Sequence, residues 1–185
     1  MIASVLKIIR DDLAEFLNSQ FVQDQLKVLV DKLMLLNGKS TIDGTNNQLV
    51  ITLLDIQQER DVQHSRTSDL AQPYYLNLLL LFSAYEKEED RQPEGYLRTW
   101  EYLNAVIHFF QRYPVFTPQT HNELPEGIEY LKFDLTTEDL RENSFIWTMT
   151  GAKHAPSVLY KVRSLPIGDY LTQRVSRIVN GVSVL

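Results

Sequence analysis

The sequence predicts an α+β fold: a four-stranded, mostly antiparallel or mixed sheet flanked by helices. Three observations support this. Apolar residues recur at helical spacing in three stretches, near the start of the chain, from Tyr96 and after Thr136. Four runs, at 48–60, 74–85, 128–135 and 157–165, are rich in β-branched and aliphatic residues. The resulting order of helix, strand, strand, helix, strand, helix and strand is typical of α+β domains.

The first two helices are predicted from stripes of apolar residues. The first is expected over residues 1–20, with one face formed by Ile2, Val5, Ile9, Leu13 and Phe16. The helix in the middle of the chain is expected from Tyr96 and to end before Pro114, after the breaker at 93–95. Its stripe, which we expect to be buried, consists of Tyr96, Trp100, Leu103, Ile107 and Phe110.

A third helix is expected to begin with Thr136 or Thr137 as its N-cap, because acidic residues follow in the first turn. It should end at Gly151, a residue suited to the left-handed conformation of a C-cap. Four of its residues are expected to be buried: Leu140, Phe145, Trp147 and Met149.

The strands allow one pairing to be predicted. The runs at 48–60 and 74–85 are consecutive, so we expect an extended hairpin, and the nearly continuous apolar run in the second predicts a central strand. The stretch 21–36 is consistent with either a second helix or an irregular pair of strands, and its periodicity does not separate the two.

The 185 residues suffice for one domain with a substantial core, and a composition of 44% hydrophobic and 23% charged residues excludes global disorder. We expect a single α+β domain over 1–166 and a C-terminal arm over 167–185 that lies between subunits. No apolar run approaches the roughly 20 residues that span a bilayer, so direct membrane insertion is not expected. The first helix carries acidic residues and no basic leader, so we expect folding in the cytoplasm.

Charge is unevenly distributed along the chain. The net charge is −6, but from Ala152 onward there are five bases and one acid, which leaves −10 on the rest. An acidic body with a basic end does not suggest nucleic-acid binding. It suits head-to-tail association, in which the basic end of one copy meets an acidic face of another. The same charge distribution is also explained by a chance unevenness of solvent-exposed charges that contact no partner.

The sequence motifs of common enzymes and metal sites predict no catalytic, cofactor-binding or metal-binding residues in this chain. The chain has no cysteine, and its four histidines are far apart in sequence. Gly38-Lys39-Ser40-Thr41 resembles the end of a phosphate-binding loop, but Leu33 stands where that loop requires glycine. The G-x-S-x-G motif of common serine hydrolases is absent.

Four blocks in order carry a family resemblance. They are ITLLDIQQER (51–60), YYLNLLLLFSAY (74–85), VIHFFQRYPVFTP (106–118) and IWTMTGAKHAPSVLYKVRSL (146–165). Together they resemble the cap, or tube-terminator, proteins of phage-tail-like contractile injection systems of the antifeeding-prophage type. The resemblance covers residues 1–167.

The resemblance implies a structural subunit that forms a six-fold ring on the end of the inner tube, stops tube and sheath polymerisation, and joins tube to sheath. Its implied partners are further copies of itself, the inner-tube protein, the sheath protein and a second cap paralogue. The chain would then become part of the injection particle after assembly. Two alternatives are a monomeric adaptor that bridges other subunits and a small-molecule enzyme.

We predict an intersubunit interface from charge. Lys161, Arg163, Arg174 and Arg177 are expected to contact a neighbouring subunit or the tube, although Lys161 and Arg163 could equally be solvent-facing strand residues. The long polar loops at 61–73 and 86–94 are the other candidates for partner contact, the second because it carries Glu88, Glu89 and Asp90.

Overall fold

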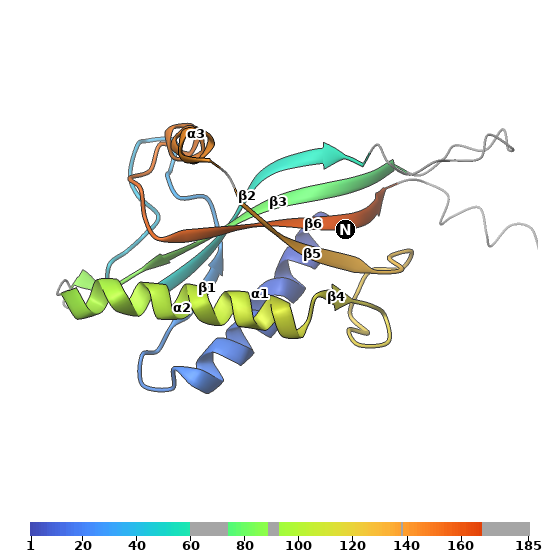
Figure 1. Ribbon diagram of the computed structural model, residues 1–185, viewed down its shortest axis with the longest axis horizontal. Helices are drawn as coiled ribbons and strands as arrows, with labels where there is room; N and C mark the ends of the chain where they lie inside the picture. Colours follow the sequence, from blue (N-terminus) through green and yellow to red (C-terminus); the bar gives the residue numbers. More distant parts are fainter. Residues whose placement is uncertain (60–73, 89–92, 138, 168–185) are drawn as a thin grey trace, which may run out of the picture.

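The computed structural model describes residues 1–59, 74–88, 93–137 and 139–167 (Figure 1). Within these ranges the fold is α+β, as predicted. The helices are α1 (Ile2–Gln20), α2 (Pro93–Arg112) and α3 (Leu140–Thr150). The strands are β1 (Lys27–Val30), β2 (Gln48–Gln58), β3 (Tyr74–Tyr85), β4 (Val115–Phe116), β5 (Leu131–Thr136) and β6 (Ser157–Ile167).

The strands form one mixed sheet in the order β1-β2-β3-β6-β5-β4. Only β1 and β2 are parallel; the other neighbours in this sheet are antiparallel. The expected hairpin is present as β2 and β3, and β3 is a central strand, as predicted. The expectation of four strands was wrong for the described residues, which contain six. The additional β1 lies in the ambiguous stretch at 21–36, and β4 has only two residues, too few to show a period.

The sheet is covered differently on its two faces. In Figure 1, α1 and α2 lie below the sheet and α3 lies above one end of it. The main hydrophobic core lies between the sheet and the first two helices, whereas a smaller cluster around Leu81, Trp147 and Leu159 lies under α3. Beyond α3, the same face of β5 and β6 carries polar side chains, among them Lys132, Asp134 and Arg163.

An aromatic cluster fixes α2 to the middle of the sheet. Phe110 is 2% exposed, and its ring centroid lies 5.4 Å from that of Phe82 on β3 and 4.6 Å from that of Phe133 on β5. Tyr160 on β6 completes the cluster, at 4.6 Å from Phe110. Burial raises the pKa of Tyr160 to about 12.

The buried side of α2 differs from the predicted one. Leu103 and Phe110 are buried as expected, but Tyr96 and Trp100 are 51% and 44% exposed. The helix also begins at Pro93 rather than Tyr96, because proline is well suited to a first helical position. The apolar spacing predicted the helix correctly, but Tyr96 lines a groove and Trp100 lies on the exposed side of the helix, so neither ring is fully covered.

Two expectations for α3 were wrong. Its N-cap is Asp139, whose Oδ1 accepts hydrogen bonds from the backbone N–H groups of Arg141 and Glu142 at 2.8 Å each. Of the residues expected to be buried, Trp147 is 5% exposed, whereas Phe145 and Met149 are 67% and 64% exposed. The helix packs on the smaller cluster through Trp147 and Ile146, whereas Phe145 and Met149 lie on its exposed side. Gly151 ends the helix with φ 69°, as predicted.

Candidate functional site

The predicted interface residues fall in separate places. Lys161 and Arg163 lie on β6, on the face that carries α3, whereas Glu88 follows the end of β3. Lys161 pairs with Leu79, six residues before Tyr85 on β3, so these cations are about 20 Å along the sheet from the acidic segment. Glu89, Asp90, Arg174, Arg177, the loop at 61–73 and the arm after Ile167 lie outside the described residues.

Arg163 already has partners within the chain. Its Nε lies 2.8 Å from Oδ2 of Asp134 on β5, and its NH1 lies 3.6 Å from Oε2 of Glu59. The Nε contact does not have the direction of a hydrogen bond, so it is an ion pair. Lys132 also approaches Asp134, at 2.8 Å. A partner at this face would therefore meet a mixed charge cluster, and the predicted roles of Arg163 and Lys161 stay predictions.

A groove of about 780 Å³ lies at the end of the sheet where β3 ends and β6 begins. Its lining residues include Gly151 at the end of α3 and Tyr96 near the start of α2, two elements that lie on the left of Figure 1. Four segments line it: residues from 33–44 ahead of β2, residues from 84–88 after β3, Tyr96 on α2, and 151–156 ahead of β6. Sequence reasoning did not find this groove, because it forms from loops that are distant in the chain.

Backbone contacts hold the acidic wall of the groove in place. The N–H of Glu88 donates to the carbonyl oxygen of Gly44 at 2.8 Å, and the N–H of Lys87 donates to Oδ1 of Asn47 at 3.0 Å. Gly44 has φ +68°, and a Cβ at this position would lie 2.6 Å from Cγ of Glu88. Glycine is therefore required here both by the backbone conformation and by the close approach of Glu88.

The loop that carries Gly44 is itself braced by Asp43. The Oδ1 of Asp43 accepts from the N–H of Thr45 at 2.9 Å and from Nε2 of Gln48 at 2.5 Å. The hydrogen bonds from Thr45 lower the pKa of the Asp43 carboxyl, so it is ionised at neutral pH. Gln48 is 1% exposed at the start of β2, which anchors the loop to the sheet.

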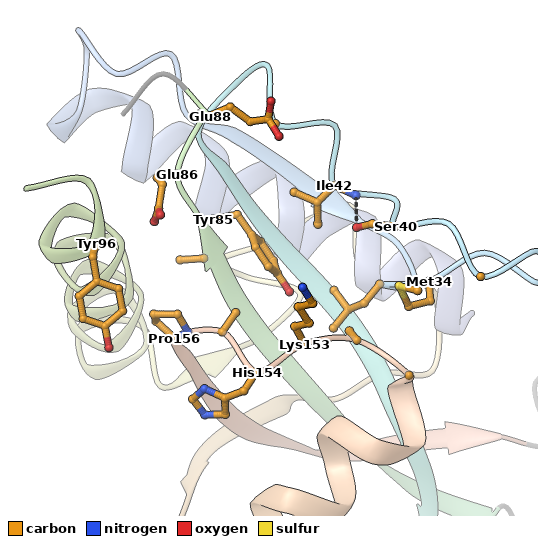
Figure 2. A pocket seen from close by; sticks show the side chains of 17 residues that line it. Met34, Ser40, Ile42, Tyr85, Glu86, Glu88, Tyr96, Lys153, His154 and Pro156 are labelled. Atoms are coloured by element: carbon orange, nitrogen blue, oxygen red, sulfur yellow. Dashed lines mark hydrogen bonds between the residues drawn. The ribbon is translucent and has the colours of Figure 1, made fainter. Parts of the chain in front are cut away.

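The groove carries charges of both signs and an aromatic rim. Figure 2 shows Glu86 and Tyr96 on the wall opposite Ile42 and Met34, with the Tyr85 ring and the Lys153 side chain extending toward each other in the middle. Burial raises the pKa of the Tyr85 hydroxyl, so it stays protonated and can donate a hydrogen bond. These groups suit the binding of a polypeptide segment with polar and apolar side chains.

The phosphate-loop resemblance at 38–41 receives no support from the geometry. Gly38 and Ser40 line the groove, but the loop leads into strand β2 and not into a helix. Its hydroxyls serve the loop itself: Ser40 Oγ accepts from the N–H of Ile42 at 3.1 Å, and Thr41 Oγ1 donates to the Lys32 carbonyl at 2.5 Å. Among the described residues there is no group of three side chains placed to hold a metal ion.

A second exposed feature adjoins the groove on α2. Tyr96, Leu97 and Trp100 are 51%, 61% and 44% exposed, and the Tyr96 and Trp100 rings meet edge-on at 6.3 Å. Large apolar side chains gathered on one helix turn are typical of a surface that another protein covers. The signal was present in the sequence as the apolar stripe that predicted the helix, but spacing alone does not say what covers it.

Over the described residues, this fold defines a small α+β domain with a charged and aromatic groove at one end of its sheet. The chain belongs to the Pvc16 N-terminal domain family, whose family model matches residues 4–180. This confirms the family resemblance of the four sequence blocks. A comparison with curated proteins gives no match.

Two solved structures are similar to the chain. One is a sheath/tube terminator of an extracellular contractile injection system, PVC, in its extended state, with a TM-score of 0.55 and 16% identity over 91% of this chain. The other is the tube-terminating cap of the anti-feeding prophage, with a TM-score of 0.47 and 14% identity over 85% of this chain. The chain spans 57% and 55% of the length of these two proteins. In the part of the chain that the structure describes, no helix is long and apolar enough to cross a membrane.

Proposed function

We propose that the chain is a cap subunit that forms a ring on the end of the inner tube of a contractile injection system, stops tube and sheath polymerisation, and joins tube to sheath. The observation that carries this proposal is the family match over residues 4–180. The likeness in fold to a sheath/tube terminator over 91% of the chain supports it. Six copies, inner-tube protein and sheath protein are the proposed composition.

The shape of the domain is consistent with a ring subunit. A ring closes through one contact repeated head to tail, so each subunit needs two different surfaces that complement each other. The groove with its acidic wall lies at one end of the sheet, and β6 ends at Ile167, after which the sequence carries Arg174 and Arg177. An acidic surface on one copy and a basic segment on the next favour association in one orientation.

Arrest of tube growth tests this function. Purified inner-tube protein is allowed to polymerise with and without the chain, and tube lengths are measured by negative-stain microscopy. We expect shorter tubes at a chain concentration well below that of the tube protein, because one ring blocks one end. Bovine serum albumin at equal concentration is the control. An unchanged length distribution at all concentrations would contradict the proposal.

The mass in solution separates the ring from a monomeric adaptor. Light scattering on a ring should give several times the 21.5 kDa of one chain. A mass of one chain in solution, together with single copies rather than rings bound at tube ends, would favour the adaptor.

A further inference from the structure

The acidic end of the groove has the chemistry that binds an arginine side chain. Glu86 and Glu88 contribute carboxylates to the groove, and the half-exposed ring of Tyr96 lies on its rim (Figure 2). A guanidinium group pairs with a carboxylate through two parallel hydrogen bonds and stacks on an aromatic face. Lys153 and His154 also line the groove, and the Lys153 side chain lies beside Tyr85, away from Glu86.

Most of the described arginines are already engaged elsewhere. Arg10, Arg98 and Arg163 form ion pairs with carboxylates of the same chain, and the Arg112 guanidinium lies 5.5 Å from the Tyr113 ring centroid. Residues 168–185 carry two more, Arg174 and Arg177, against one acid. Valine and isoleucine follow these two arginines, so the segment offers both the charge and the apolar side chains that the groove can accept.

A chain cannot readily place its own Arg174 in its own groove. Strand β6 begins next to Pro156, which lines the groove, ends at Ile167, and runs along the length of the sheet in Figure 1. Strand β6 has 11 residues, which places Ile167 about 33 Å from the groove. Arg174 lies seven residues after Ile167 and reaches at most about 25 Å when fully extended. The groove of a second copy is the partner that remains.

We propose that the groove of one copy binds the segment around Arg174–Ile178 of a neighbouring copy, with Arg174 paired to Glu86 and packed against Tyr96. This inference rests on the proposed ring, because such a contact repeated around a ring is heterologous and closes on itself. It names the two surfaces that form that contact. It also accounts for the partly uncovered aromatic residues at the start of α2, which lie beside the same groove.

Site-directed cross-linking tests the contact. The natural chain has no cysteine, so single cysteines report one position each. The cysteines are placed beside the proposed pair, so that Glu86 and Arg174 themselves are kept. His154→Cys and Gln173→Cys chains are mixed at high concentration and treated with a short bis-maleimide, and products are separated by denaturing electrophoresis. We expect a cross-linked dimer that contains one chain of each kind, and a ladder of multiples from the His154→Cys/Gln173→Cys double variant. The control pair is Gln173→Cys with Arg141→Cys, a position on the first turn of α3.

Two outcomes would overturn the proposal: a control pair that cross-links as efficiently, or a double variant that links only within one chain. Circular dichroism checks that each variant is folded. Charge reversal gives an independent measure. Glu86→Arg or Arg174→Glu/Arg177→Glu should each weaken association about tenfold, and combining them should restore part of the loss. Absence of any restoration would also overturn the contact.

The same variants separate this inference from the proposed function. A chain that arrests tube growth but shows no pair-specific cross-link keeps the cap function and loses the contact. A chain that cross-links as expected but leaves tube growth unchanged keeps the contact and loses the cap function.

Discussion

Two residues of α2 provide the sharpest test of the fold, because they share one apolar stripe in the sequence and differ in burial. Phe110 is 2% exposed and touches four aromatic rings, with centroid distances of 4.6 to 5.4 Å. Trp100 is 44% exposed, and its ring meets that of Tyr96 edge-on at 6.3 Å. The structure therefore predicts unequal costs for the same kind of truncation.

Phe110→Ala should lower the free energy of unfolding by about 4 kcal/mol, because a buried phenylalanine is lost and the surrounding sheet cannot close the cavity. Trp100→Ala should cost about 1 kcal/mol or less. Equilibrium urea denaturation measures both, and at a slope of about 2 kcal/mol per molar urea the first variant should lose about 2 M in its midpoint. Equal losses in the two variants, or a loss below about 1.5 kcal/mol for Phe110→Ala, would refute this account of α2.

Three further predictions follow from single positions. Gly44→Ala should destabilise by about 2 kcal/mol, because it combines positive φ with a clash, whereas Gly38→Ala has positive φ in open space and should cost about 1 kcal/mol; thermal unfolding compares them. Asp139→Ala should cost about 1 kcal/mol through loss of the α3 N-cap, and Thr137→Ala should be nearly neutral in the same urea assay; the reverse order would contradict the assignment. Burial raises the pKa of Asp12 above its ordinary 3.8, so the folded state binds this proton more tightly than the unfolded state. Stability should therefore rise as the pH falls from the folded pKa toward 3.8, and Asp12→Asn should remove that rise; an identical stability–pH curve in the variant would be evidence against it.

Long periodic segments could be predicted from the sequence alone. Strands β2, β3 and β6 and helix α1 each span at least 11 residues, enough for their period to be evident. The short β4 and the four-residue β1 lack that length, and β1 pairs with β2 in parallel across a loop that has no hairpin signal.

Burial was predicted less well than element type. Tyr96, Trp100, Phe145 and Met149 are apolar residues on well-predicted helices, yet each is more than two-fifths exposed. Hydrophobic spacing reports the composition of a helix face, whereas burial depends on which other element lies against it. The N-cap of α3 was misplaced for a similar reason, since Thr136 is used by β5 and leaves Asp139 to cap the helix.

The candidate site could be predicted only in part. Charge alone drew attention to Glu88, which lines the groove, and to Arg163, which is engaged with Asp134. The groove itself depends on the approach of Gly44 to Glu88, two residues 44 positions apart, and no local pattern encodes that contact.

Direct imaging of tube ends tests the central claim most directly. The chain is given a gold-labelled affinity tag and added to purified inner-tube protein as tubes grow. The tubes are then examined by cryo-electron microscopy. The account predicts a ring of additional density with gold at one end of each arrested tube, and little gold along the walls. Gold spread along the tube walls, or bare ends on tubes of normal length, would contradict the assignment of this chain as a cap.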